Sequence, residues 1–136
     1  MSDPVRLLAV PALSDGVEYA YLATVAPSTR LVFTAGACPL GTDGRTVTPG
    51  DHVAQARQVM ANLEAALTAG GATLADVVKS TVYVASSQRA DLVAVWQVVR
   101  DTFGDHDPPS TLLGVAVLGY PDQLVEVEAI AAVAAR

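Results

Sequence analysis

Two glutamates separated by one residue, Glu126 and Glu128, are the side chains best placed for acid–base chemistry. They lie in the segment Val125-Glu126-Val127-Glu128, whose alternation is typical of a strand and places both carboxylates on one face. A partly buried carboxylate can act as a general base near neutral pH, whereas a solvated strand glutamate has no chemical role. The pattern therefore predicts a candidate base and leaves open whether it faces a pocket or solvent.

The single cysteine and the two histidines offer less chemistry. Cys38 precedes Pro39 at the end of an expected strand, and a thiolate nucleophile would need a nearby base or cation to lower its pKa. No sequence neighbour supplies one, so we expect a buried, unreactive thiol. One cysteine cannot form an internal disulfide, and the histidines show no zinc-ligand spacing with it. We expect no metal and no cofactor.

Composition indicates a compact soluble domain and excludes several classes of protein. The formal charge is −6 and the pI is about 4.6, and no cluster of Lys or Arg offsets the repulsion of a polyanion, so no nucleic-acid partner is expected. The 136 residues are 51% hydrophobic, which predicts a single domain over 1–136. No signal peptide and no apolar run of ~20 residues is evident. We therefore expect a cytoplasmic protein with no membrane partner.

The elements that must position these residues are strands and helices in a definite order along the chain. Asp51 is a plausible N-cap for a helix over 51–69 that Gly70 and Gly71 would end. A second helix is expected over 89–103. Strands are expected at 18–25, 31–35, 46–47 and 77–85, the first two joined by a turn at 27–29. After Pro108 and Pro109, two further strands flank the loop Gly119-Tyr120-Pro121 and form a two-stranded unit. This order predicts an α+β fold, a single mixed sheet with two helices packed on one face.

The other face of that sheet bears on assembly. Val77, Lys79, Thr81 and Tyr83 alternate with Val78, Ser80, Val82 and Val84, and both sets contain residues that a sheet could bury. Because the helices can cover only one face, the other is expected either to pack against a neighbouring subunit or to stay half exposed.

Four ordered segments resemble one known family. They are Phe33-Thr34-Ala35-Gly36-Ala37-Cys38-Pro39, residues 55–63, residues 76–84, and the pair formed by 107–115 and 124–131. Together they resemble the reactive intermediate deaminase (Rid, RidA or YjgF) family. The resemblance implies a chorismate mutase-like, RidA-like fold and a homotrimer with clefts at the subunit interfaces.

The resemblance also assigns site residues one at a time. Glu126 matches the glutamate that activates water. Ser110 stands where the family has an arginine that binds a substrate carboxylate through a forked pair of hydrogen bonds, which a serine cannot make. His106 is a possible replacement cation. Ala35 and Gly36 replace a Ser-Gly pair whose backbone amides hold the carboxylate, and they keep their N–H groups.

Other residues are expected to line the cleft for a small-molecule ligand. They are Cys38, Tyr19 and Tyr21, which share parity, Trp96, Thr111, Leu112 and Tyr120. Trp96 could equally serve in helix packing. Aromatic walls would make the cleft more apolar and suit a larger or neutral ligand.

Three functions stay open. The first is hydrolysis of a reactive imine or enamine that is not a simple free 2-imino acid, with a water activated by Glu126 and Ser110 as the second catalytic position. The second is a non-catalytic trimer that binds a metabolite or regulates a partner. The third is ordinary 2-aminoacrylate or 2-iminopropanoate deamination, which the missing arginine disfavours.

Overall fold

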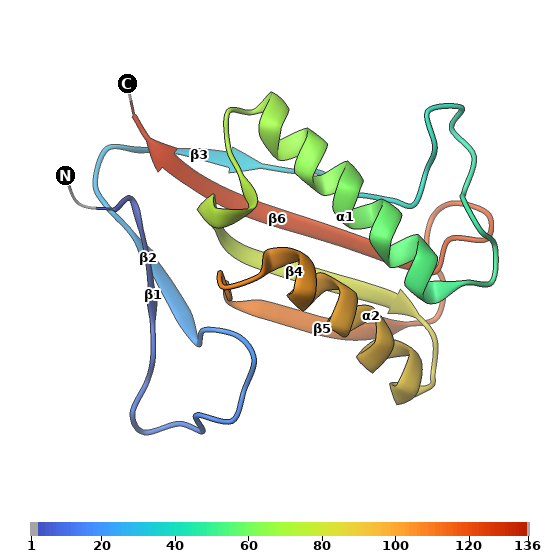
Figure 1. Cartoon of the computed structure of the whole chain (residues 1–136), viewed down its shortest axis with the longest axis horizontal. Helices are drawn as coiled ribbons and strands as arrows, with labels where there is room; N and C mark the ends of the chain where they lie inside the picture. The colour runs from blue at the N-terminus through green and yellow to red at the C-terminus, as the bar shows by residue number, and fades with distance from the viewer. Residues whose placement is uncertain (1–2, 136) are drawn as a thin grey trace.

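The computed structural model describes residues 3–135, which form two α-helices, six strands and a short 3₁₀ turn (Figure 1). In chain order these are β1 Val5–Leu8, β2 Leu22–Val25, β3 Thr29–Phe33, α1 His52–Ala69, the turn Leu74–Asp76, β4 Val77–Ala85, α2 Arg89–Phe103, β5 Ser110–Val115 and β6 Val125–Ala134. No helix within residues 3–135 is long and apolar enough to cross a membrane.

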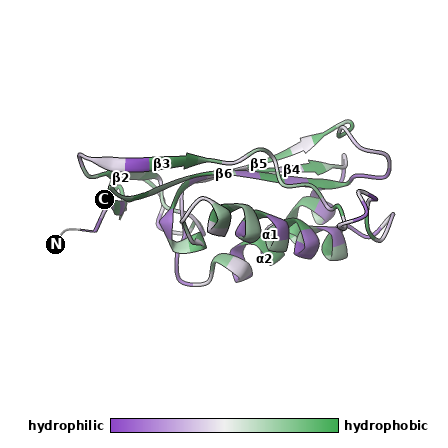
Figure 2. Cartoon of the chain, turned by 90° about the horizontal axis from the view of Figure 1, so that it is seen from above, coloured by the Kyte–Doolittle hydropathy of each residue, from purple (hydrophilic) through white to green (hydrophobic). Residues whose placement is uncertain are grey.

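Four strands form a mixed sheet in the order β3-β6-β4-β5, in which only β4 and β5 run parallel. Both helices cover the same face of this sheet, and the opposite face carries no helix (Figure 2). The predicted α+β architecture is therefore confirmed. Strands β1 and β2 pair with each other in a separate two-stranded sheet.

The two helices occupy the predicted ranges. Asp51 caps α1 because its Oδ1 accepts a hydrogen bond from the Ala54 N–H at 2.9 Å. Gly70 ends α1, and Gly104 ends α2 with φ of 66°, a left-handed conformation that glycine adopts without strain.

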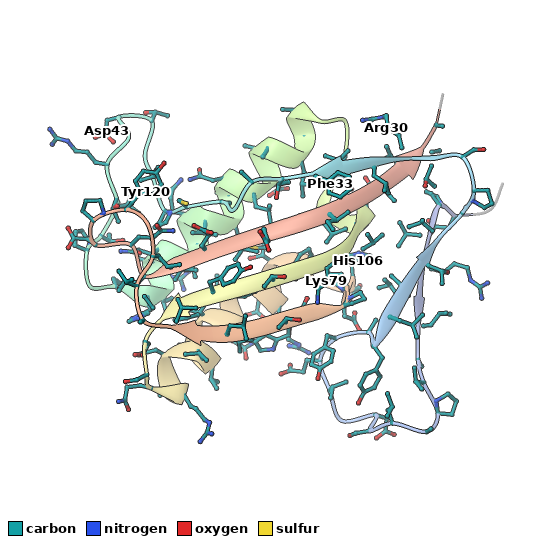
Figure 3. All side chains as sticks on the ribbon, turned by 180° about the vertical axis from the view of Figure 1, so that it is seen from behind. Arg30, Phe33, Asp43, Lys79, His106 and Tyr120 are labelled. Atoms are coloured by element: carbon teal, nitrogen blue, oxygen red, sulfur yellow. The ribbon has the colours of Figure 1, made fainter. Side chains whose placement is uncertain are left out.

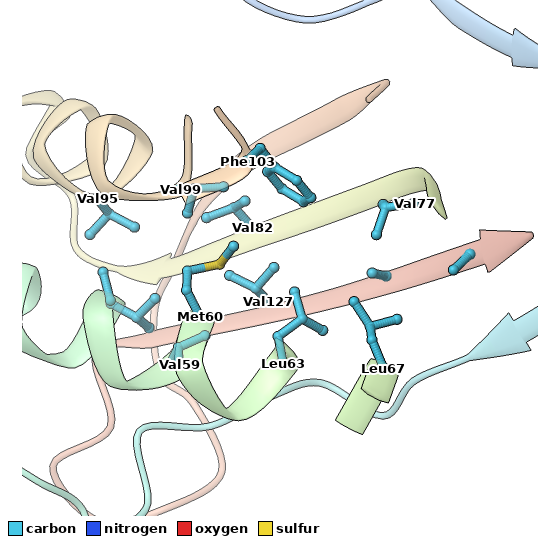
Figure 4. Close-up of a cluster of buried hydrophobic side chains, with 14 of the residues drawn as sticks. Val59, Met60, Leu63, Leu67, Val77, Val82, Val95, Val99, Phe103 and Val127 are labelled. Carbon is cyan, nitrogen blue, oxygen red and sulfur yellow. The ribbon is translucent and has the colours of Figure 1, made fainter. Parts of the chain in front are cut away.

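A single apolar core fills the space between the helices and the sheet (Figure 4). Each fully buried aliphatic side chain in it contributes roughly 1.5–3 kcal/mol. The core residues include Val59, Met60, Leu63 and Leu67 from α1, Val95, Val99 and Phe103 from α2, and Val82, Val84, Val125 and Val127 from the sheet. Because alternate residues of β4 and β6 are fixed in this core, their neighbours must point to the open face.

Several strand predictions were wrong. The first predicted strand, 18–25, begins only at Leu22 and pairs with the unpredicted β1 rather than with β3. The predicted strand 46–47 is a single bridge between Leu40 and Thr46. The two C-terminal strands do not form a two-stranded unit, because β4 lies between β5 and β6.

Val77 lies on the other face from the one expected. It is buried in the core, because an irregularity in the β4–β6 register between Val77 and Lys79 changes the parity of the strand. From Lys79 onward the alternation is regular, with Ser80, Val82 and Val84 buried.

Candidate functional site

The open face of the sheet carries both glutamates. Glu126 is paired with Tyr83 and Glu128 with Thr81, and both alternate with the buried Val125, Val127 and Ala129, as the sequence pattern predicts. Figure 3 shows this face, with Phe33 on β3 and Lys79 on β4. Its residues are Leu31, Phe33, Lys79, Thr81, Tyr83, Thr111, Leu113, Glu126, Glu128 and Ile130.

One oxygen of Glu126 is held by two donors. The Cys38 thiol donates to Oε1 at 3.2 Å, and the Gln123 amide donates to the same oxygen at 3.1 Å. Within residues 3–135 no hydrogen bond uses Oε2, and no buried side-chain oxygen there lacks a partner, so Oε2 is accessible to solvent. An ordered carboxylate with one free oxygen can take a proton from a water molecule.

The free oxygen lies against Gly36. The Thr34 N–H bonds to the Ala129 carbonyl at 3.0 Å and the Ala37 N–H to the Val127 carbonyl at 2.7 Å, so Ala35 and Gly36 together oppose the single residue Glu128. This is a β-bulge, a feature often found beside active sites. A Cβ at Gly36 would overlap Glu126 Oε2 and lie 2.6 Å from its Cδ, so only glycine leaves room for this carboxylate.

Cys38 is held beside Glu126 as a protonated thiol. Burial, followed by the hydrogen bond and negative charge of Glu126, raises the pKa of Cys38 to about 11, while the Gln123 contact lowers it. The raised pKa keeps the thiol neutral at physiological pH, and Cys38 is half-buried rather than buried as expected. The Asn62 amide fixes this segment by donating to the carbonyls of Cys38 at 2.8 Å and Leu40 at 2.9 Å. We call Gly36, Cys38, Gln123 and Glu126 the carboxylate site.

Glu128 has a different environment from Glu126. Its Oε1 accepts a hydrogen bond from the Tyr83 hydroxyl at 2.8 Å, and that bond is the main cause of the raised pKa of Tyr83. The Lys79 ammonium, on the same face, donates to the Thr111 hydroxyl at 2.8 Å. The Thr111 hydroxyl is therefore hydrogen-bonded to Lys79 on the open face.

A second group of predicted residues forms a cleft at the β5 edge of the sheet. The Tyr19 ring lies 6.4 Å from the Trp96 ring and 5.9 Å from the Tyr21 ring, both edge to face. The two rings are in contact, but their segment is not a strand and Tyr21 does not line this cleft, because its hydroxyl instead donates to the Ser14 carbonyl at 2.7 Å. Trp96 both packs against the core and lines the cleft. The cleft, which we call the aromatic cleft, is lined by Tyr19, Trp96, Ser110, Thr111 and Leu112.

Ser110 is not positioned to bind an anion. It pairs with the buried Ser80, contacts its hydroxyl, and donates to the Pro108 carbonyl at 2.9 Å. The His106 Nε2 is 2.7 Å from the Val77 carbonyl, which fixes this nitrogen as the donor. Arg100 lines a pocket that also includes Ser110 and His106, and it forms an ion pair with Glu18. Both basic side chains near Ser110 therefore already have partners.

The carboxylate site and the aromatic cleft are separated within one chain. Through Ser80 on β4, Ser110 on β5 is in register with Ala129 on β6, which is the second strand across from it. Glu126 lies on β6 three residues from Ala129. This corresponds to roughly 10 Å across the strands and roughly 10 Å along them. Ser110 also faces the helix side with Ser80, whereas Glu126 faces the open side. One chain alone does not bring the two predicted catalytic residues together.

Tyr120 lies apart from the aromatic cleft, toward the other end of the sheet from His106 (Figure 3). It lines a hollow with Arg45 and Thr46, and its N–H donates to Gln123 Oε1 at 3.1 Å. Gln123 was not predicted as a site residue, because a polar residue after a turn is typical of an ordinary loop. Only the fold reveals that its amide reaches Glu126.

Comparisons with known proteins agree with one another. Residues 15–133 match the sequence model of a family described as Endoribonuclease L-PSP. A RutC family protein of Pyrococcus horikoshii is 36% identical over 102 residues, which make up 75% of this chain and 79% of that protein. The 2-iminobutanoate/2-iminopropanoate deaminase of Escherichia coli is 34% identical over 105 residues, or 75% of this chain and 79% of the deaminase.

A solved structure extends the similarity to nearly the whole fold. The crystal structure of YyfB from Yersinia pestis, described as a conserved Rid family protein of unknown function, superposes with a TM-score of 0.88. The two are 30% identical, and the match covers 96% of this chain and 100% of YyfB.

Proposed function

This chain belongs to the Rid (YjgF) family, and from that premise we propose that it hydrolyses a reactive imine or enamine with a water activated by Glu126. The observation that carries this proposal is the Glu126 carboxylate, which is held on Oε1 and open on Oε2 beside the Gly36 bulge. The deaminase named in Escherichia coli supplies the reaction class.

The reaction needs one base that later returns its proton. Glu126 Oε2 would take a proton from water as the water oxygen bonds to the imine carbon and the C=N π electrons move to nitrogen. It would return that proton to the nitrogen, which gives a neutral carbinolamine. In the second step Glu126 would take the hydroxyl proton as the C=O bond forms and the C–N bond breaks, and pass it to the departing nitrogen, which leaves as ammonia. The net change is one imine and one water converted to one carbonyl compound and one ammonia. A positioned base of this kind contributes about 10²–10⁴-fold in rate.

The substrate is proposed to differ from a small free 2-imino acid. Binding such a carboxylate calls for a forked cation, whereas the Ser110 hydroxyl is committed to the Pro108 carbonyl. The aromatic cleft around Ser110 is instead built from Tyr19, Trp96 and Leu112. These walls favour an imine with a larger apolar or aromatic substituent.

The active unit is proposed to be a homotrimer. Two copies could place the carboxylate site of one chain opposite the aromatic cleft of its neighbour, which a single chain cannot do. The open sheet face offers an apolar surface for that contact, with Phe33 69% exposed. The net charge of −6 favours a small-molecule substrate over RNA, despite the ribonuclease wording of the family description.

Ammonia release from freshly generated imines tests the proposal. The purified protein should accelerate hydrolysis above the spontaneous rate, more for neutral or aromatic imines than for 2-iminopropanoate. Glu126→Gln should lose about 10²–10⁴-fold of that acceleration, whereas Glu128→Gln, on the same strand and face, should keep most of it.

Two other outcomes would contradict parts of the proposal. A preference for 2-iminopropanoate would restore the ordinary deaminase interpretation. No acceleration of any imine would favour a metabolite-binding protein that has lost the reaction together with the arginine.

A further inference from the structure

Two neighbours of Glu126 have no part in the chemical steps above, yet both donate to its Oε1. Cys38 Sγ lies 3.2 Å and Gln123 Nε2 3.1 Å from that oxygen. From this geometry we propose that Cys38 and Gln123 are positioning residues that hold Oε1 and thereby direct Oε2 toward the ligand. The inference rests on the proposed function and adds the means by which its base is oriented.

Gln123 can present its amide in only one orientation. The side chain is buried, with 4% of the residue exposed, and its Nε2 also donates to the Val125 carbonyl at 3.1 Å. Its Oε1 accepts from the Tyr120 N–H at 3.1 Å. Exchanging the oxygen and the nitrogen would break all of these bonds, so the amide N–H is fixed toward Glu126.

Cys38 supplies the second donor from a segment that is itself held in place. Its carbonyl accepts from Asn62 on α1, and its Sγ lies 3.4 Å from the Gly36 carbonyl as well as 3.2 Å from Glu126. A carboxylate is the stronger acceptor of these two, so the thiol proton is directed to Glu126. Because the thiol stays protonated at neutral pH, this donor is present under working conditions.

Gly36 completes the restraint from the opposite side. Oε1 is bound by two donors, and Oε2 occupies the space that a side chain at position 36 would fill. Rotating the carboxylate out of this position would break both hydrogen bonds. The orientation of the base is therefore set by three residues that need not touch the substrate.

Thiol reactivity tests the geometry without any assay of turnover. The chain has one cysteine, so alkylation by iodoacetamide at mildly alkaline pH reports on Cys38 alone. Glu126→Gln removes the charge that disfavours the thiolate and should speed alkylation severalfold, up to about tenfold. Gln123→Leu removes the amide donor that shares Oε1 with Cys38, so the thiol faces a less neutralised carboxylate and alkylation should slow.

Glu128→Gln is the matched control, because the Glu128 carboxylate that it removes accepts a hydrogen bond from Tyr83 rather than from Cys38. It should leave the alkylation rate unchanged. Equal rates in the parent and Glu126→Gln, or rates that change in the same direction in Glu126→Gln and Gln123→Leu, would overturn the proposed contacts.

Kinetics test the positioning role. Cys38→Ala should lower kcat about tenfold to hundredfold with KM nearly unchanged, because a misdirected base still permits binding. Cys38→Ser, whose hydroxyl can donate to the same oxygen, should recover most of the loss. A Cys38→Ala protein with the parent kcat would overturn the positioning role. Inertness of every protein toward every imine would instead refute the proposed function, while the alkylation rates would still decide whether Cys38 and Gln123 hold Glu126.

Discussion

The direction of the Glu126 carboxylate is set by two hydrogen-bond donors on one side and by the absence of a side chain at Gly36 on the other. Donors from Cys38 and Gln123 meet on Oε1, and the missing side chain of Gly36 makes room for Oε2. Glu128, two residues away on the same face, is bonded to the Tyr83 hydroxyl instead. Two chemically identical side chains on one strand thus have different surroundings, and only Glu126 has the surroundings of the proposed base.

Replacing Gly36 with alanine should misplace this base without removing it. The new methyl would lie 2.6 Å from the Glu126 Cδ, so the carboxylate must swing away from Cys38 and Gln123. We expect kcat/KM for imine hydrolysis to fall about 100-fold while the circular dichroism spectrum is unchanged. Gly119→Ala is the control, because a Cβ there meets no atom within 4 Å. Equal activity in the two variants would contradict this account.

For single residues, the sequence predicted which face of the sheet a side chain occupies better than it predicted which side chains touch. Alternation along Val125-Glu126-Val127-Glu128 was enough to place both glutamates together. The contact between Cys38 and Glu126 joins residues 88 positions apart, and no local pattern encodes it. Ser110 and Glu126 were expected in one site, yet they lie on different faces because side-chain parity on β5 depends on its register with β4.

The N-terminal end of α1 anchors the loop that precedes β6. Gln55 is fully buried, and its Oε1 accepts from the Leu124 N–H at 2.8 Å. Its Nε2 donates to the carbonyls of Asp122 at 3.0 Å and Thr48 at 3.3 Å. One helical side chain thus satisfies the backbone of two loops and fixes the turn that carries Gln123.

Gln55→Met, which keeps the length of the side chain but not its polarity, should destabilise the protein by about 1–3 kcal/mol, because buried backbone groups lose their partners. Urea unfolding measures this free energy. Gln97→Met on α2 removes only an exposed bond to Asp101 and should change the free energy of unfolding by less than about 0.5 kcal/mol. Equal effects of the two substitutions would show that the Gln55 bonds are dispensable.

The helices and the packing of both on one sheet face were predicted well, whereas the order in which the strands pair was not. Both helices have an apolar period and a following glycine, and their predicted ranges are confirmed. Strand β1 was missed because four residues before Pro11 carry little periodic signal. The insertion of β4 between β5 and β6 depends on the α2 crossover, which joins β4 to β5 in parallel and leaves the other edge of β4 for β6.

The carboxylate site and the aromatic cleft lie too far apart within one chain to form one site. The carboxylate site opens on the helix-free face, and the aromatic cleft lies at the β5 edge, where Thr111 is on that face and Ser110 is on the helix side. The helix-free face also exposes Leu31, Phe33 and Leu113, which a monomer would leave in water. A second and third copy covering this face would bury these residues and complete the sites together, which links assembly to activity.

Phe33→Glu should therefore abolish assembly and activity at once. The parent is expected to sediment at three times the 14.0 kDa chain mass, and the variant at the mass of one chain, because a charge would replace the most exposed aromatic ring on the helix-free face. Val93→Glu is the matched control, since Val93 is 62% exposed but lies on α2, away from that face. It should leave both sedimentation and ammonia release unchanged. A parent that sediments as a monomer yet hydrolyses imines would separate activity from assembly, and would require Glu126 to act without a neighbour's aromatic cleft.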